Sequence, residues 1–374
     1  MKVGILTLHS NTNFGGGLQQ IALFEVLKSL GHDPRFLCVE NDSCRSSMKR
    51  FVGILTSYSP PQLYNAAEEA YHRLVDKKVW RRPNWDLYHK TDDFNYSHLN
   101  YTPKFGLREL PEYVAGCNAL VFGSDQVWTD VYSDILPFFG DGIPDFKGKK
   151  IAYAACSVHR RAPIYNRRKL RALLADFDAV SVRDDTSRKL VENYSDTTPP
   201  IVCDPTLLYD FGAYIKPSPI EGDYIFAYVL GDKTAEWHRR NLDRIKKQTG
   251  LSKVVVLTTE LDGDYPWADT VITDALAVDW MNILRASGFV YTNSYHAVLF
   301  ALKFHRRFVA YYGDLVRSTR MLGLRKQFGL ESRIVREPSE VDLTGKLDFT
   351  ATDSAIKALA KSSMTFLRCA LEKL

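Results

Sequence analysis

Short apolar runs that end in capping or small polar residues recur along the chain. The clearest is residues 289–291, which predict a buried strand, followed by the cap-type residues Thr292, Asn293 and Ser294 and then by a helical pattern. We interpret this stretch as a strand-to-helix junction of an α/β sheet. Ligands of open α/β sheets bind at such carboxyl ends of strands, so we expect a binding site here.

His296 lies in the first turn of the helix predicted after Ser294. The N-terminus of a helix offers free N–H groups and the positive end of its dipole, which suit an anion. A histidine beside such a site can hydrogen-bond a phosphate or carboxylate, or transfer a proton. Asn293, Ser294 and Tyr295 are expected to bind substrate at the same junction. The alternative is a histidine that packs or caps within an ordinary turn.

The N-terminal segment predicts a second strand-to-helix junction. Residues 3–8 form an expected strand, and a polar, glycine-rich loop with Asn13, Gly15 and Gly16 leads into a helix at 18–30 and a strand at 36–39. This order indicates a Rossmann-like opening. The loop lacks the GxGxxG pattern, so a dinucleotide is not expected. The glycines would let the backbone approach another ligand, or would form a tight turn before the helix.

Two further strands deliver polar residues to their carboxyl ends. Residues 119–122 lead to Ser124, Asp125, Gln126 and Trp128, a crowded set that suits recognition of sugar hydroxyls. The alternative is a turn closed by the aspartate, with Trp128 buried.

Residues 179–182 form a predicted strand that presents Arg183 and Asp184. An arginine at a strand end can hold a carboxylate or phosphate with two parallel hydrogen bonds. The alternative is a salt bridge to Asp184, Asp185 or another neighbour. A further apolar run at 200–203 leads into the turn-forming residues Asp204, Pro205 and Thr206.

The remaining pattern divides the chain into two α/β sets. Residues 41–115 are less regular, with a helix expected from Pro60 to about Trp80 and an aromatic, charged insertion at 81–101, which we expect on the acceptor side of a cleft. Residues 211–222, rich in Pro and Gly, predict a linker. Beyond it, strands are expected at 224–230, 254–258 and 308–311, and helices at 233–249, 275–286, 318–328 and 353–371. We therefore expect domains at 1-212 and 223-345 and a C-terminal helix at 350-374.

Composition narrows the class of protein. With 374 residues, 45% hydrophobic and 25% charged, the chain is expected to be globular with two domains. The net charge of +5 slightly favours anionic small molecules or an acidic membrane surface and does not call for nucleic acid. The six cysteines form no CxxC pair, and no apolar run is long enough for a transmembrane helix. A strand directly at the N-terminus argues against a signal peptide, so we expect a cytoplasmic protein.

Several of these motifs together resemble the polysaccharide pyruvyl transferase family. Each motif is short, but their order and spacing are specific. They are Asn13-Phe14-Gly15 with Leu18-Gln19, Val121 through Trp128, Ser181-Val182-Arg183-Asp184, Asp204-Pro205-Thr206, Thr292 through His296, and Arg320 through Arg333.

The resemblance implies a GT-B-like α/β fold of two Rossmann-like domains with an interdomain cleft. It also implies phosphoenolpyruvate as donor, a glycan or lipid-linked sugar as acceptor, and a pyruvyl ketal as product. Some members place an arginine two residues before the active-site histidine, where this sequence has Ser294. Anion binding is then expected to depend on Arg183 and the helix N-terminus, with another basic residue as an open alternative.

His296 is the expected proton-transfer residue, and Asp125 is the second catalytic candidate, as a base toward a sugar hydroxyl. Arg183 is expected to bind one anionic end of the donor. No cofactor or metal is expected, because an arginine and a helix dipole can neutralise the donor's charge. Contact with the cytoplasmic face of the membrane is compatible with a lipid-linked acceptor. Two other functions stay open: a GT-B glycosyltransferase that uses a sugar nucleotide, and a non-catalytic protein of glycan assembly.

Overall fold

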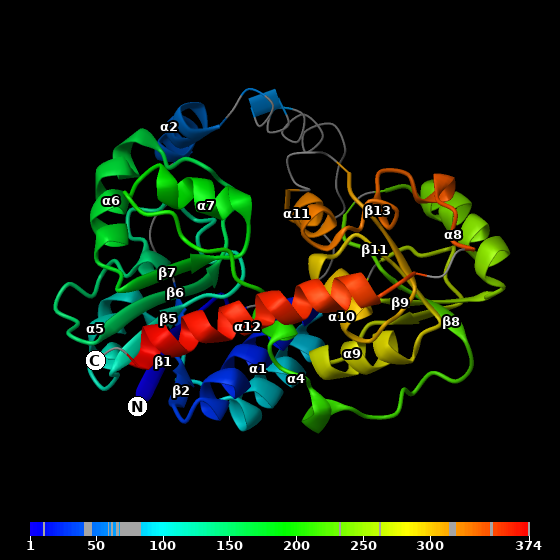
Figure 1. The fold of residues 1–374 in the computed structure, drawn as a ribbon, viewed down its shortest axis with the longest axis horizontal. Helices are drawn as coiled ribbons and strands as arrows, with labels where there is room; N and C mark the ends of the chain where they lie inside the picture. The colour runs from blue at the N-terminus through cyan, green and yellow to red at the C-terminus, as the bar shows by residue number, and fades with distance from the viewer. Residues whose placement is uncertain are drawn as a thin grey trace.

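Two α/β halves lie side by side, and one long helix crosses from the second half to the first (Figure 1). The computed structural model describes residues 1–9, 12–40, 47–58, 60, 63–64, 67, 84–231, 233–261, 263–313, 319–344 and 347–372. The helix expected from Pro60 to about Trp80 lies mostly outside the described residues.

The first half is built on a five-stranded parallel sheet. Its central strands are completely buried, as expected for a parallel sheet covered on both faces by helices. Because all five strands run in the same direction, their carboxyl ends meet at one edge. The strand order is β2 (Asp33–Phe36), β1 (Lys2–Leu6), β5 (Ala119–Phe122), β6 (Lys149–Ala155) and β7 (Ala179–Val182).

The first helix begins earlier than predicted. The expected glycine-rich loop is instead the first turn of α1 (Phe14–Ser29), because Asn13 acts as its N-cap and its Oδ1 accepts a hydrogen bond from Gly16 N at 3.0 Å. The other described α-helices of this half are α2 (Ser47–Ser57), α4 (Trp85–His98), α5 (Leu110–Val114), α6 (Arg167–Ala175) and α7 (Asp185–Glu192), and the short strands β3 (Val39–Glu40) and β4 (Phe105–Gly106) pair with each other.

The second half repeats the architecture with a six-stranded parallel sheet. The predicted strands and helices occur within a few residues of their expected positions, while the short edge strands β10 and β13 were not predicted. The strand order is β10 (Thr270–Ile272), β9 (Lys253–Leu257), β8 (Tyr224–Tyr228), β11 (Phe289–Thr292), β12 (Phe308–Tyr311) and β13 (Ile334–Val335). Its helices are α8 (Ala235–Thr249), α9 (Ala277–Ala286), α10 (Tyr295–Lys303) and α11 (Thr319–Phe328).

Residues 208–223, which lead into β8, contain one short turn of 3₁₀ helix, Gly212–Tyr214. We propose a domain division at this segment, with limits of 1-212 and 223-345, because the strands of the two sheets fall on either side of it.

The C-terminal helix α12 (Thr350–Glu372) connects the halves. Near its start, Asp353 Oδ1 lies 3.0 Å from His305 Nε2 of the second half. Near its end, Ser363 Oγ accepts a hydrogen bond from Cys203 N at 2.9 Å, and Lys149 Nζ donates to Ala370 O at 3.2 Å. The helix therefore packs on both halves.

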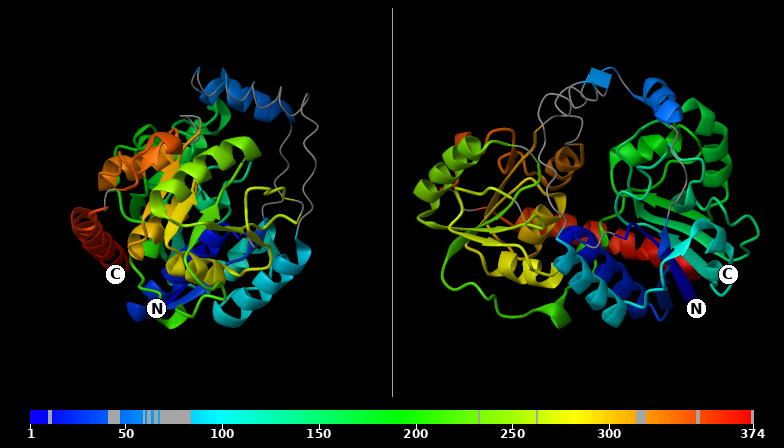
Figure 2. Two further views of the ribbon diagram at one scale, coloured as in Figure 1. Left: turned by 90° about the vertical axis from the view of Figure 1, so that its right-hand side faces the viewer. Right: turned by 180° about the vertical axis from the view of Figure 1, so that it is seen from behind.

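A second set of contacts joins the halves on the opposite side of the molecule. Figure 2 shows α1 and α4 lying between the two sheets when the molecule is seen from behind. Asn84 Nδ2, at the N-cap of α4, donates to Thr273 O at 2.7 Å, and the ring of Phe14 stacks on Trp280 of α9 with centroids 5.9 Å apart. The aromatic segment predicted as a surface insertion thus lies partly at the boundary between the halves.

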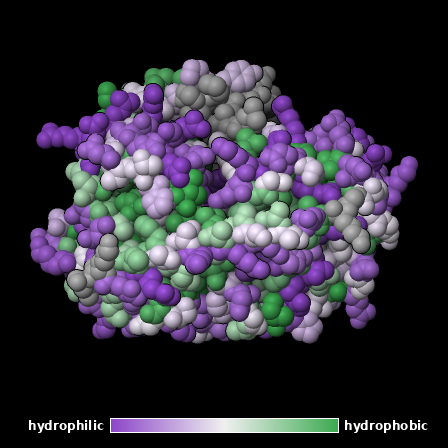
Figure 3. Space-filling view, in the orientation of Figure 1, coloured by the Kyte–Doolittle hydropathy of each residue, from purple (hydrophilic) through white to green (hydrophobic). Residues whose placement is uncertain are grey.

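The surface seen in Figure 3 is hydrophilic over the outer parts of both halves, with a paler and more hydrophobic band across the middle. In the part of the chain that the structure describes, no helix has the length and apolar character needed to cross a membrane.

Candidate active site

The predicted junction at the end of β11 is present. Thr292 Oγ1 accepts from Ser294 N at 3.0 Å, and Ser294 Oγ accepts from Ala297 N as the N-cap of α10. These bonds fix the chain direction as it leaves the sheet. His296 is therefore held in the first turn of α10, at the carboxyl end of a central strand.

His296 faces the first half. Its side chain packs so closely on α1 that a Cβ atom added to Gly15 would lie 2.2 Å from His296 Nδ1. On its other side, His296 Nε2 lies 3.4 Å from Asp204 Oδ2. The residue is only 5% exposed. The glycine expected to approach a ligand thus makes room for the histidine of the opposite half.

Asp204 is the functional candidate that sequence reasoning missed, although its strand-end turn had been noted. Its Oδ1 accepts from Thr206 N at 3.0 Å and from Thr206 Oγ1 at 2.8 Å, and its Oδ2 accepts from Arg183 Nη1 at 2.6 Å. Burial raises the pKa of Asp204, but the nearby charges of His296 and Arg183 outweigh it and hold the pKa well below its usual value. The group is therefore a carboxylate that can orient His296.

Arg183 bridges two carboxylates from different strand ends. Nη1 donates to Asp204, and Nη2 donates to Asp125 Oδ1 at 2.9 Å. Its guanidinium lies over the ring of Tyr295, 4.6 Å from the centroid. Each terminal nitrogen thus donates once to a carboxylate, and the expected contact of Arg183 with the donor stays a prediction. The salt-bridge alternative applies, with partners other than those predicted.

Four side chains form one charged network: His296, Asp204, Arg183 and Asp125. Asp125 lies at the end opposite His296. Its Oδ1 is also 3.8 Å from Arg320 Nη1 of α11. Burial raises the pKa of Asp125, but the charges of Arg183, His296 and Arg320 bring it below its usual value. Asp125 is therefore ionised at neutral pH and can accept a proton or a hydrogen bond. Its neighbour Gln126 is partly exposed.

Two of the expected sugar-binding residues lie inside the first half. Trp128 is 0% exposed, stacks on Phe139 with centroids 4.9 Å apart, and donates from Nε1 to Phe138 O at 2.9 Å. Ser124 is fully buried, and its backbone oxygen accepts from Thr7 Oγ1 at 3.1 Å. Neither side chain faces an open site, so the structure corrects both expectations.

Other expected binding residues have structural partners. Asn293 Oδ1 accepts from Leu230 N at 2.7 Å and its Nδ2 donates to Leu230 O, so its amide holds the loop after β8. Asp184 caps α7 by accepting from Ser187 N at 2.8 Å, and its other oxygen lies 2.9 Å from Cys156 Sγ. Asn13 is exposed but caps α1, and Gly16 is buried in the first turn of that helix.

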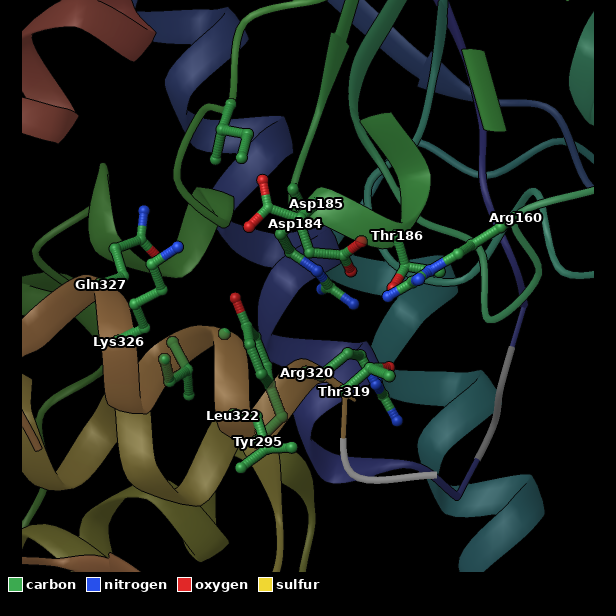
Figure 4. Close-up of a pocket in the computed structure, with 14 residues that line it drawn as sticks. Arg160, Asp184, Asp185, Thr186, Tyr295, Thr319, Arg320, Leu322, Lys326 and Gln327 are labelled. Carbon is green, nitrogen blue, oxygen red and sulfur yellow. The ribbon is translucent and has the colours of Figure 1, made fainter. Parts of the chain in front are cut away.

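A pocket of about 420 Å³ opens between the halves, next to this network (Figure 4). Arg183, Asp184 and Tyr295 line it, whereas His296 and Asp125 do not. Figure 4 places Arg160 and Lys326 at opposite sides of the pocket, with Asp184 and Tyr295 between them. Its lining comes from both halves: Arg160, Arg183, Asp184, Asp185, Thr186 and Ile201 from the first, and Tyr295, Thr319, Arg320, Leu322, Gly323, Leu324, Lys326 and Gln327 from the second.

The pocket contains basic residues that were not predicted as site residues. They are Arg160, Arg320 and Lys326. No local sequence motif distinguishes them from ordinary surface cations, although Arg320 begins one of the motifs noted above. Within the described ranges, no group of three or more His, Cys, Asp and Glu side chains is arranged to hold a metal ion. The arrangement therefore offers a histidine 3.4 Å from a carboxylate, a second carboxylate, and a neighbouring basic pocket.

The chain is similar to known proteins both in sequence and in fold. A family model described as polysaccharide pyruvyl transferase matches residues 13–314. No curated protein matches the chain at a significant level.

Among solved structures, a protein described as a UDP-N-acetylglucosamine 2-epimerase from Listeria monocytogenes has a TM-score of 0.53 at 10% identity, over 96% of this chain and 90% of that chain. The UDP-GlcNAc 2-epimerase from Methanocaldococcus jannaschii has a TM-score of 0.51 at 8% identity, over 99% of both chains. These similarities show the fold, which is GT-B-like with two Rossmann-like domains and a cleft between them.

Proposed function

The chain belongs to the polysaccharide pyruvyl transferase family, and we propose that it transfers a pyruvyl group from phosphoenolpyruvate to two hydroxyls of a sugar. The observation that supports this reaction best is the meeting of His296 with Asp204 at the boundary of the two halves, 3.4 Å apart and beside a basic pocket. A proton-transfer group next to an anion-binding pocket fits a donor that is both a phosphate ester and an enol.

The reaction balances without a cofactor. One sugar hydroxyl adds its oxygen to the central carbon of phosphoenolpyruvate and gives up its proton to a base, while a proton is added to the methylene carbon, which becomes a methyl group. The second hydroxyl oxygen then displaces phosphate from the same carbon, and its proton leaves to a base or to the phosphate. The products are a cyclic pyruvyl ketal and inorganic phosphate.

In this proposal His296 supplies the proton to the methylene carbon, and Asp204 keeps its ring in place through the contact at Nε2. Asp125 receives a proton from a hydroxyl, because it is ionised and lies at the end of the same network. Arg183 positions both carboxylates. Because His296 is only 5% exposed, in this proposal substrate enters while the halves are apart at the contact between α10 and α1, and it reacts after they have packed together again.

The acceptor in this proposal is a cell-surface glycan or its lipid-linked precursor, modified on the cytoplasmic side of the membrane. A free or lipid-linked sugar with two neighbouring hydroxyls satisfies the chemistry. The cleft between two Rossmann-like halves can separate donor from acceptor, with the acceptor on the side of the first half.

The test is calorimetric titration of the purified protein with phosphoenolpyruvate and, separately, with UDP-N-acetylglucosamine. We expect binding of phosphoenolpyruvate and none of the sugar nucleotide. A panel of sugar diols is then screened for phosphoenolpyruvate-dependent phosphate release. His296→Ala should cut turnover by ~10²–10⁴ while circular dichroism stays unchanged. Binding of the sugar nucleotide alone would reject the proposal in favour of a glycosyltransferase.

A further inference from the structure

The pocket between the halves carries more positive than negative charge that is available to a ligand. Of its arginines, Arg183 is neutralised by Asp125 and Asp204. Arg160 and Lys326 are exposed and form no ion pair within the described part of the chain. The excess of cations on the pocket wall favours an anion with more than one charge.

The two carboxylates on the pocket wall offset only part of this excess, because four basic residues line the same pocket. Asp184 caps α7 by accepting from Ser187 N at 2.8 Å, and Asp185 lies 3.6 Å from Arg188 of the same helix. Both acidic groups thus have partners of their own on the first half.

Arg320 lines the pocket and also lies near Asp125, so it is between the pocket and the network that contains His296. Its side chain is 28% exposed, and its Nη1 lies 3.8 Å from Asp125 Oδ1, beyond hydrogen-bond distance. Its guanidinium is 5.9 Å from the ring centroid of Tyr295, on the ring that also contacts Arg183. Arg320 is therefore held near the carboxylate while its N–H groups remain available to a ligand in the pocket.

We propose that Arg320, together with Arg160 and Lys326, forms the subsite for the phosphate group of the donor. The identity of the donor in this inference rests on the proposed function, whereas the position of the subsite rests on the residues that line the pocket. A phosphate monoester carries close to two negative charges at neutral pH and matches the planar fork of an arginine. Arg183 is less suited to this part, because its side chain is only 1% exposed and its charge is already paired with two carboxylates.

The subsite draws its cations from both halves. Arg160 comes from the first half, whereas Arg320 and Lys326 lie on α11 of the second. Like charges that face each other across the boundary repel when the pocket is empty, and a dianion between them removes that repulsion. Occupation of the subsite therefore stabilises the packed arrangement of the two halves, which places the donor next to the network that contains His296.

The experiment compares three ligands by calorimetry: phosphoenolpyruvate, inorganic phosphate and pyruvate. In Arg320→Gln, affinity for the first two should fall by about 10- to 100-fold, the range for one charged hydrogen-bonding partner, while affinity for pyruvate stays unchanged. Arg320→Lys should recover only part of the affinity, because a lysine lacks the fork. The matched control is Arg325→Gln on the same helix, whose guanidinium lies 3.4 Å from Tyr312 Oη and outside the pocket.

Two results would overturn the subsite: unchanged phosphate affinity in Arg320→Gln, or equal losses in Arg320→Gln and Arg325→Gln. Failure of the proposed function is distinguishable, because inorganic phosphate reports on the subsite without the donor. If wild type binds phosphate but not phosphoenolpyruvate, and Arg320→Gln loses the phosphate, the subsite stands and the assigned donor is wrong.

Discussion

At the scale of single residues, the site depends on one close contact between the halves. Gly15 in the first turn of α1 leaves the space that the imidazole of His296 fills, and Asp204 lies on the imidazole's other side. The ring is thus confined between a backbone and a carboxylate. Such confinement lowers the entropic cost of reaching a reactive geometry, since the ring has little freedom left to lose.

We therefore expect Gly15→Ala to impair catalysis more than stability. The added methyl group would lie 2.2 Å from His296 Nδ1, so the ring or the helix must shift. A displacement of about 1 Å can cost ~10²-fold in turnover. Turnover and melting temperature of the variant check this prediction, with Gly116→Ala as control because no atom lies within 4 Å of its new methyl group. Equal turnover in the two variants would show that the contact is not needed.

At the scale of single elements, α8 carries a buried histidine that no ligand site explains. His238 Nδ1 lies 3.0 Å from Tyr291 Oη of β11, and its ring lies 4.9 Å from that of Trp267. Burial, with a smaller effect of Lys233, lowers the pKa of His238 to about 4. The neutral ring thus belongs to the packing between α8 and the sheet.

This packing predicts that the free energy of unfolding decreases as the pH falls. The pKa of His238 is below its unfolded value of 6.5, so between these values the unfolded chain binds more protons and stability falls as the pH falls. Between pH 7 and 5 the group should cost roughly 2 kcal/mol of the free energy of unfolding.

Urea unfolding at both pH values measures this cost, and His238→Gln should lose less stability than wild type over the same interval. Comparing the two proteins cancels the contribution of other histidines, such as His159, whose pKa burial also lowers to about 4. If both proteins lose the same free energy, His238 is not a source of the acid sensitivity.

At the scale of the whole molecule, α12 provides one of the two sets of contacts that hold the halves together. Its first turns contact the second half through Asp353, whereas Ser363 and the backbone of Leu371 contact the first, and Leu367 between them is buried. The contact between His296 and Gly15 is made across the same boundary. The geometry of the catalytic network therefore depends on a helix remote from it in sequence.

Leu367→Ala should destabilise the whole protein by ~2–5 kcal/mol, the usual cost of truncating a fully buried leucine. Because α12 packs on both halves, we expect one thermal transition at a lower temperature rather than two. Differential scanning calorimetry measures this, and the exposed Lys361→Ala on the same helix should change the free energy of unfolding by less than about 0.5 kcal/mol. Two separated transitions in wild type would contradict a structural connection through α12.

The sequence by itself determined the elements and the fold class. The strands at Ala119–Phe122 and Ala179–Val182 have the predicted bounds, because a short apolar run ended by polar residues is a local signal. The junction at Thr292 to His296 follows from its capping residues in the same way. The edge strands β10 and β13 were missed because they are too short to carry a pattern.

Only the tertiary structure decided which polar groups meet. Arg183 pairs with Asp125 and Asp204, 58 and 21 residues away, because the order β5, β6, β7 and the bridge between Val182 and Ile201 bring these chain segments to one edge. Trp128 is buried, and Gly15 is required for His296, because of packing between segments that are distant in sequence. A local pattern predicts that a residue lies at a strand end. It cannot predict the partner there, because that depends on strand order and on how the two halves pack together.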